Sequence, residues 1–275
     1  MRIGFIGAGR VGYSLSKYLN DSFKNVKGIY SKNIENAIDC ANFSVSEYYK
    51  DLKTLVFDCD TLFLTVNDDA LISVVEELKK LNIKDKILIH TSGCQSSSIF
   101  DSLKDKNRCM SLHPIYAFSS KYKSYEGIKD IYFTHEGDDA LEIEALFPKR
   151  IISINADDKI KYHAACVMIS NLICGITYEA EKIFKEIGFQ SIEPFIPLLE
   201  DNIKNISKYG PVKALTGPVV RNDSKTVLKH IEALNGRDLE IYKQISRVLV
   251  EMSLINHHDD YSIMKNILED SNDNS

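Results

Sequence analysis

The stretch Gly7-Ala8-Gly9-Arg10-Val11-Gly12 decides the fold, because it joins an apolar run at residues 3–6 to a helical pattern at residues 11–19. A strand, a glycine-rich turn and a helix in this order are typical of a dinucleotide-binding unit. There the first glycine permits the tight turn, the second admits a pyrophosphate, and the third lets helix pack on strand. We predict that residues 7–12 bind a dinucleotide through the N–H groups opening the helix; the alternative is an ordinary glycine-rich turn.

The end of the second predicted strand, residues 26–30, indicates which dinucleotide is bound. NAD sites usually carry Asp or Glu there, where the carboxylate accepts a hydrogen bond from the ribose 2′-hydroxyl. This chain has Ser31 and Lys32 instead, followed by Asn33. Ser31 can donate a hydrogen bond, and Lys32 with Arg10 can supply positive charge to a 2′-phosphate. NADP(H) is therefore the predicted cofactor, and the alternative is that Lys32 is simply a solvated surface lysine.

The first half of the chain alternates strand and helix patterns, and the second half is helical throughout. Strands alternating with helices predict an α/β fold, a doubly wound and mostly parallel Rossmann sheet. The last predicted strand ends at residue 154, and helical spacing starts at residue 157. We therefore predict a dinucleotide-binding domain at residues 1–154 and an all-helical substrate or dimerisation domain at residues 155–275. A single long helix is expected over residues 159–187.

Polar loops follow the predicted strands at the edge where ligands of open α/β sheets bind. Val66 and Asn67 should run beside the cofactor, although Asp69 in the same loop is also a possible helix cap. Thr91 and Ser92 follow the next strand and could fix the nicotinamide or the substrate by hydrogen bonds. His113 precedes a proline, which restricts its backbone, and a structural role for this histidine is the alternative.

The predicted helix at residues 159–187 carries a polar stripe on an otherwise apolar sequence. The stripe follows helical spacing and comprises Lys159, His163, Ser170, Asn171 and Cys174. Buried polar groups need partners, because each unpaired one costs about 1–3 kcal/mol. A catalytic cleft and a self-satisfying network between helices are both consistent with such a stripe. A second polar segment surrounds Arg221, which could clamp an anion or pair with a neighbouring aspartate.

Composition excludes several classes of protein. The net charge is −5 without a basic cluster, which argues against nucleic acid or an anionic membrane as partner. No apolar run reaches the ~18 residues that a membrane helix needs, and no secretory leader is visible. The six cysteines form no C-x-x-C pair, so neither a zinc site nor another metal site is expected. A reducing cytoplasm is the expected location.

The motifs together resemble one family. The chain carries six motifs in the order in which they occur in that family: GAGRVG at residues 7–12, TVNDDA at 65–70, HTSG at 90–93, HPIYAF at 113–118, KIKYHAACVMISN at 159–171 and LTGPVVRND at 215–223. These are Rossmann-like proteins with a C-terminal domain of unknown function, related to deazaflavin-dependent NADP reductases and to pyrroline-carboxylate and 6-phosphogluconate-type dehydrogenases. The resemblance implies an NADP-binding domain and a helical domain that often forms a homodimer. It departs from the hydroxyacid dehydrogenases, whose catalytic Lys is followed four residues later by Asn; here Lys159 is followed by His163.

These observations predict hydride transfer between NADP(H) and a small carbonyl or imine substrate. His163 or Lys159 would protonate or orient the reacting atom, and Asn171, Ser92 and His113 would hold the substrate or the carboxamide. A Rossmann fold does not guarantee catalysis, so a nucleotide-responsive module without turnover is the alternative. A third hypothesis keeps catalysis but makes a deazaflavin or flavin coenzyme the hydride acceptor.

Overall fold

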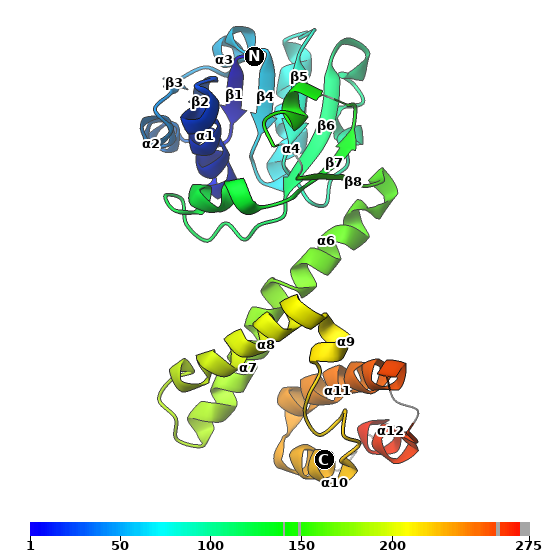
Figure 1. Cartoon of the computed structure of the whole chain (residues 1–275). Coiled ribbons are helices and arrows are strands. Elements are labelled where there is room, and N and C mark those ends of the chain that lie inside the picture. Colours follow the sequence, from blue (N-terminus) through cyan, green and yellow to red (C-terminus); the bar gives the residue numbers. More distant parts are fainter. Residues whose placement is uncertain (140, 148–149, 257–258, 270–275) are drawn as a thin grey trace. The chain divides into compact units, whose positions relative to one another are not determined.

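The computed structural model describes residues 1–139, 141–147, 150–256 and 259–269 (Figure 1). The chain divides into two compact units, Met1–Ser170 and Asn171–Ser275. The first unit contains one eight-stranded sheet in the order β3-β2-β1-β4-β5-β6-β7-β8. Its strands are β1 Ile3–Ile6, β2 Val26–Tyr30, β3 Glu47–Tyr49, β4 Thr61–Leu64, β5 Ile87–His90, β6 Arg108–Pro114, β7 Phe133–Gly137 and β8 Ile151–Ser153.

The predicted mostly parallel sheet is confirmed, with one exception. Each neighbouring pair is parallel except β6 and β7, which are antiparallel. The chain order reverses beside β1, since β2 and β3 extend the sheet on one side and β4, β5 and β6 extend it on the other. Such a reversal is the point at which open α/β sheets bind ligands.

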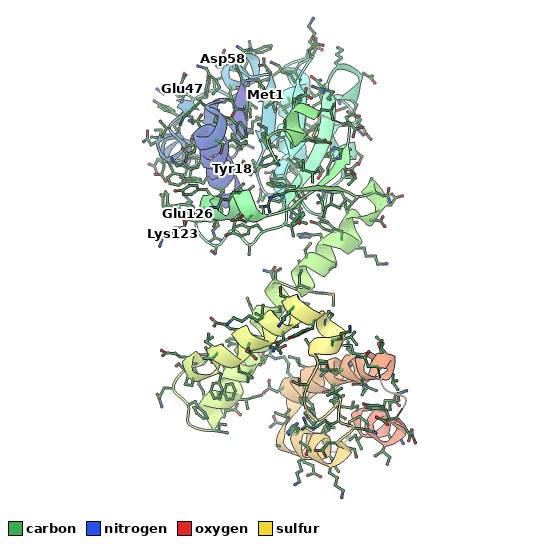
Figure 2. The ribbon with its side chains drawn as sticks, in the orientation of Figure 1. Met1, Tyr18, Glu47, Asp58, Lys123 and Glu126 are labelled. Carbon is green, nitrogen blue, oxygen red and sulfur yellow. The ribbon has the colours of Figure 1, made fainter. Side chains whose placement is uncertain are left out.

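Helices cover both faces of this sheet. The helices of this unit are α1 Arg10–Phe23, α2 Ile34–Ser44, α3 Leu52–Asp58, α4 Asp68–Lys80, α5 Leu141–Glu144 and α6 Lys159–Met168, with short 3₁₀ turns η1 Ser97–Phe100, η2 Lys104–Lys106, η3 Ser124–Asp130 and η4 Ala156–Asp158. Alternate residues of β1 point to opposite faces: Ile3 and Phe5 join a core with α1, α2 and η3, whereas Ile6 joins a core with α3 and α4. Charged side chains such as Glu47 and Lys123 lie exposed at the periphery (Figure 2).

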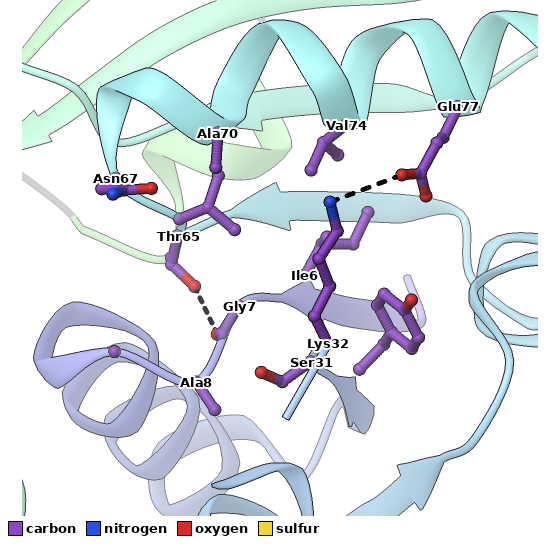
Figure 3. Close-up of a pocket in the computed structure, with 13 residues that line it drawn as sticks. Ile6, Gly7, Ala8, Ser31, Lys32, Thr65, Asn67, Ala70, Val74 and Glu77 are labelled. Atoms are coloured by element: carbon purple, nitrogen blue, oxygen red, sulfur yellow. Dashed lines mark hydrogen bonds and ion pairs between the residues drawn. The ribbon is translucent and has the colours of Figure 1, made fainter. Parts of the chain in front are cut away.

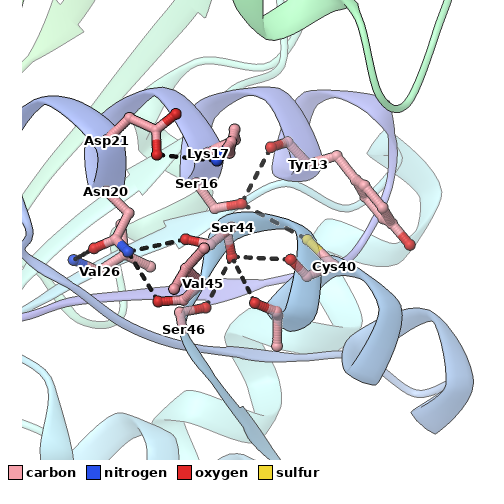
Figure 4. Close-up of polar contacts among 11 residues, drawn as sticks. Tyr13, Ser16, Lys17, Asn20, Asp21, Val26, Cys40, Ser44, Val45 and Ser46 are labelled. Atoms are coloured by element: carbon pink, nitrogen blue, oxygen red, sulfur yellow. Dashed lines mark hydrogen bonds and ion pairs between the residues drawn. The ribbon is translucent and has the colours of Figure 1, made fainter.

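A buried polar network holds α1 against α2 (Figure 4). Asn20 donates to the carbonyls of Ser44 and Val45 at 2.9 and 3.0 Å, and its Oδ1 accepts from the N–H of Val26 at 3.3 Å. The Asn20 side chain thereby provides hydrogen-bond partners for two carbonyls at the end of α2 and for the N–H at the start of β2. Such fully paired buried amides fix the relative placement of the elements that they join.

The second unit is helical, as predicted. Its helices are α7 Asn171–Glu186, α8 Ile196–Tyr209, α9 Pro211–Ala214, α10 Ser224–Ala233, α11 Gly236–Asn256 and α12 Ser262–Glu269, with the turn η5 Glu193–Phe195. Asp223 caps α10 by accepting from Thr226 N–H at 3.1 Å. A small core forms around Val227, Val250 and Met264. Residues 171–218, all described by the structure, include no buried side chain.

The boundary between the units differs from the predicted one at residues 154 and 155. α6 belongs to the first unit, where Lys159 at its start is 1% exposed and donates to groups on β6 and in the loop after β5. The predicted single helix is also interrupted: α6 ends at Met168, and α7 begins at Asn171. The polar stripe is therefore divided between two helices and two units.

One expectation about hydropathy is wrong. The helical run Ala156–Glu186 is long and apolar enough to cross a membrane by length and composition, with a mean hydropathy of 1.3 over its best window. Reading the sequence for uninterrupted apolar runs missed it, because single polar residues such as His163 and Asn171 break the run without lowering its average much.

Candidate functional site

The glycine-rich loop has the conformation that its three glycines predict. Gly7 has φ +112°, a region that favours glycine. A Cβ on Gly12 would lie 2.5 Å from the Gly7 carbonyl oxygen, whereas a Cβ on Gly9 would come no closer than 3.6 Å to any described atom outside its own neighbourhood. Thr65 Oγ1 donates to the Gly7 carbonyl at 2.8 Å and so ties the loop to β4. The loop is rigid at Gly7 and Gly12 and open at Gly9.

The start of α1 offers unsatisfied donors. Gly9 is the N-cap, and within the described residues no side chain caps this helix and no acidic residue stands in its first turn. The N–H groups of the first turn of a helix lack partners inside the helix, and they carry the positive end of its dipole. Together with the space at Gly9, they form a fitting cradle for a pyrophosphate.

An open pocket of about 290 Å³ lies beside this loop, at the carboxyl ends of β1, β2 and β4 (Figure 3). Seven predicted cofactor residues line it, namely Gly7, Ala8, Gly9, Ser31, Lys32, Val66 and Asn67. The remaining lining residues are Ile6, Tyr30, Thr65, Ala70, Val74 and Glu77. Ala70, Val74 and Glu77 were missed, although their i, i+4 and i+7 spacing on a predicted helix would have placed them on one face.

The other predicted cofactor residues lie outside the lining of this pocket. Arg10, Val11 and Gly12 form the first turn of α1, where Arg10 is exposed. Thr91 and Ser92 follow β5 and are each 9% exposed. Asn67 is the N-cap of α4 without a side-chain cap bond, and Asp69 lies in the first turn, so Asp69 does not take the capping position.

A second group of polar residues, here called the histidine cluster, gathers at the ends of β5 and β6. It consists of His90, Ser92, Gly93, Ser111, His113, Lys159, Tyr162 and His163. Four of these residues come from the loops predicted at the sheet edge, and three come from α6. The structure thus brings together His113, Lys159, His163 and Ser92 of the predicted site, whereas Asn171 opens α7 in the second unit.

Lys159 is the buried centre of the histidine cluster. Its Nζ donates to Ser111 Oγ at 2.5 Å and to the Ser92 carbonyl at 3.2 Å. Burial lowers the pKa of the Lys159 ammonium, and Glu136 partly opposes this effect. The Lys159 side chain is 1% exposed in this structure. Lys159 therefore holds the loop after β5 against β6.

His113 and His163 face a common space. Their rings meet edge to face with centroids 5.8 Å apart. A Cβ on Gly93 would lie 2.5 Å from His163 Nδ1 and 2.9 Å from His113 Nε2, so only a glycine leaves room for both rings. His163 Nδ1 is buried and has no hydrogen-bond partner among the described residues. Buried orphan groups of this kind call for an explanation such as a ligand or water.

Two histidines of the cluster, His90 and His113, are held neutral by lowered pKa values. Burial, with His163 and Lys159 nearby, lowers the pKa of His113 to about 4. Its Nδ1 lies 2.8 Å from the Tyr162 hydroxyl. Burial, with Lys159, lowers the pKa of His90 to about 3. The N–H of Ser92 donates to His90 Nδ1 at 3.2 Å, so the other ring nitrogen carries the proton and donates to the Ser96 carbonyl.

Other predicted features have less support as sites. Arg221 is exposed in the second unit, and its neighbour Asp223 is engaged in capping α10. The six cysteines are free thiols. Among the residues that the structure describes, no three His, Cys, Asp or Glu side chains gather as a metal site would require.

Two family models match the chain. Residues 2–93 match the NADP oxidoreductase, coenzyme F420-dependent family, and residues 138–249 match a domain of unknown function, DUF2520. The chain therefore combines an NADP-binding Rossmann domain with that C-terminal domain, and the resemblance deduced from the motifs is confirmed. No curated protein sequence matches the chain.

Solved structures share the fold over nearly the whole length. Protein TM1727 of Thermotoga maritima is 25% identical, with 92% of this chain and 98% of that chain covered and a TM-score of 0.71. BF3122 of Bacteroides fragilis, titled as a candidate NADP oxidoreductase, is 20% identical over 91% and 98%, with a TM-score of 0.74. An imine reductase of Myxococcus stipitatus in complex with NADP⁺ is 15% identical, with 98% of this chain and 100% of that chain covered and a TM-score of 0.62.

Proposed function

We propose that this protein, whose N-terminal domain is of the NADP oxidoreductase family, transfers a hydride between NADP(H) and a small carbonyl or imine substrate. The observation that carries the proposal is the pocket at the strand-order reversal, where the uncapped start of α1 faces a space that also holds Lys32. NADP(H), when bound, supplies or accepts the hydride. The chain itself has to hold the pyrophosphate and the 2′-phosphate, and to orient the substrate.

Residues 7–12 would hold the pyrophosphate, and Ser31 and Lys32 would hold the 2′-phosphate. Val66 and Asn67 line the same pocket beside the loop. Thr91 and Ser92, after β5, are assigned to the carboxamide or the substrate. These roles follow from position at the carboxyl edge of the sheet.

Within the histidine cluster we assign His163 as the group that protonates or orients the reacting atom. Its Nδ1 is the buried nitrogen without a partner, and it borders the space left by Gly93. His113, held neutral, would accept or donate one hydrogen bond beside it. Lys159 is a positioning residue, because within the described part of the chain its ammonium donates to the Ser92 carbonyl and to Ser111 Oγ and so joins the loop after β5 to β6. Asn171 remains a predicted substrate-binding residue.

The test is a screen for NADPH oxidation with aldehydes, keto acids, and ketones mixed with amines, which supply imines. His163→Asn should lower kcat about 10²-fold or more, the range for removal of a general acid, and leave the Kd for NADPH unchanged. His230→Asn is the control, since the same substitution is made at a histidine of the second unit outside the histidine cluster, 2.8 Å from the hydroxyl of Tyr242. NADPH binding without turnover, and no effect of His163→Asn, would favour a nucleotide-responsive module.

A deazaflavin coenzyme is the second candidate acceptor. The family that residues 2–93 match is described as coenzyme F420-dependent, which favours this variant of the reaction. The hydride of NADPH would reduce the deazaflavin ring, and a proton from solvent would complete the reduced coenzyme. Loss of the deazaflavin absorbance band on mixing with NADPH and protein would support it, and an unchanged band would exclude it.

We also propose that the second unit mediates a homodimer in the cytoplasm. α7 and α8 expose large apolar side chains such as Leu172, Ile176 and Leu198, at 50%, 46% and 73%. Monomeric proteins rarely leave apolar surface of this kind uncovered, and the resemblance implies a second copy as the cover. Sedimentation of the purified chain should give twice the mass of 31.2 kDa, and Leu198→Glu should shift it toward monomer. A monodisperse monomer, or recovery only with lipid or detergent, would contradict the dimer.

A further inference from the structure

An acidic residue lies beside the predicted 2′-phosphate site, although none follows β2. Glu77 on α4 lines the same pocket as Ser31 and Lys32. One of its carboxylate oxygens lies 3.7 Å from the Lys32 ammonium, as the dashed line in Figure 3 shows. Lys32 Nζ also donates to Ser73 Oγ at 3.4 Å. The Lys32 ammonium, which is predicted to bind the 2′-phosphate, is thus already paired with Glu77 and Ser73 of α4.

This pairing has different consequences for the two cofactors. A 2′-phosphate carries nearly two negative charges at neutral pH. If it contacts Lys32, it competes with Glu77 for the same ammonium and is repelled by the Glu77 carboxylate. A 2′-hydroxyl carries no charge, so Glu77 and Lys32 can stay paired beside it. The carboxylate therefore opposes NADP(H) and leaves NAD(H) nearly unaffected.

We propose that Glu77 is a specificity-determining residue that limits the preference of this pocket for NADP(H) over NAD(H). It holds Lys32 while the pocket is empty and releases it to the 2′-phosphate. This inference rests on the proposed function, since it concerns the same cofactor pocket.

The partial exposure of the pair sets the size of the effect. The side chains of Lys32 and Glu77 are 64% and 38% exposed, so solvent and salt screen their charges. A single exposed charge pair changes affinity by about a few-fold rather than by orders of magnitude. The effect should be largest at low ionic strength and should shrink as salt is added.

The experiment compares the Kd values for NADPH and NADH in the full-length protein and in three variants, Glu77→Gln, Glu76→Gln and Lys32→Gln. Glu76 is the matched control, because it is the preceding residue of α4, does not line the pocket, and lies 4.0 Å from Lys79. Glu77→Gln should lower the Kd for NADPH about three- to tenfold in low salt and change that for NADH less than about twofold. Glu76→Gln should change neither, and Lys32→Gln should weaken NADPH only.

Two results would overturn the inference alone. An NADPH affinity in Glu77→Gln equal to that of Glu76→Gln would show that the carboxylate does not act on the 2′-phosphate. A weaker NADPH affinity in Glu77→Gln would show that Glu77 positions Lys32 for the phosphate. If the unmodified protein binds neither cofactor, the proposed function fails, and the inference fails with it; this outcome is distinct from the first two.

Discussion

The cofactor pocket and the histidine cluster stand at the same edge of one sheet but are built in different ways. The pocket is built around a backbone loop, Gly7 to Gly9, beside the uncapped start of α1, and side chains from the end of β2 and from α4 complete its lining. The cluster is formed by side chains that are mostly buried and that bond to one another, around Lys159 and His90. A backbone site depends on a short local motif, whereas a side-chain site depends on residues that are far apart in the chain.

The largest expected effect comes from closing the backbone site at its tightest point. Gly12→Ala would place a Cβ 2.5 Å from the Gly7 carbonyl oxygen and 2.8 Å from Thr65 Oγ1. We expect it to destabilise the fold by about 1–3 kcal/mol, as overpacking does, and to weaken NADPH binding about 100-fold or more, which is about 2.8 kcal/mol. Thermal unfolding and fluorescence titration measure the two effects.

Gly9→Ala separates the two effects. Its Cβ would have 3.6 Å of clearance in the free protein, so stability should change by less than about 1 kcal/mol. NADPH affinity should still fall, because the methyl group occupies the approach of the pyrophosphate. Equal destabilisation by the two substitutions would show that the three glycines do not have the separate roles assigned here.

The next effect concerns the histidine cluster and should leave the pocket intact. Gly93→Ala would place a methyl group against both His113 and His163. We expect kcat to fall about 10-fold to 100-fold, because displacing a proton donor by about 1 Å costs on that order, with the Kd for NADPH unchanged. Steady-state kinetics alongside titration checks this. A variant that loses NADPH affinity as much as turnover would mean that the two regions are one site.

The last effect is a pH dependence of stability that the cluster should cause and the pocket should not. The pKa of His90 is lowered to about 3, so its neutral form is stabilising at pH values above its ordinary pKa of 6.5. As pH falls below 6.5, His90 becomes protonated in the unfolded chain but stays neutral in the folded chain. The free energy of unfolding therefore falls by up to about 1.4 kcal/mol per pH unit. Urea unfolding between pH 7 and pH 4.5 should show a flatter profile for His90→Gln. An identical profile would exclude His90 as the source.

The sequence predicts the cofactor pocket better than it predicts the histidine cluster. The roles of Gly7 and Gly12, the mostly parallel sheet and seven of the lining residues could be predicted, because a local motif and strand–helix alternation determine them. The strand β3, only three residues long, was missed, and so was the antiparallel pairing of β7. Whether two strands pair parallel or antiparallel depends on how the chain between them crosses the sheet, and no local sequence pattern predicts that.

The cluster could be predicted in membership but not in geometry. Helical spacing predicted that Lys159 and His163 share a helix face. It did not predict that Lys159 is buried against Ser111 while His163 borders Gly93. That difference depends on how α6 packs on β5 and β6, which is a tertiary contact. Glu77 was missed for another reason: the search for an acidic residue was confined to the end of β2, and α4 supplied it from across the pocket.

The central claim is that the start of α1 binds the pyrophosphate of NADP(H). Its most direct test is a fluorescence titration of the purified protein and of Gly9→Ala with NADPH. The account predicts saturable binding to the unmodified protein with a Kd of about 1 µM to 1 mM, the usual range for enzyme ligands, and clearly weaker binding to a variant that remains folded. No saturation by NADPH or NADH at millimolar concentration, or equal affinity in Gly9→Ala, would contradict it.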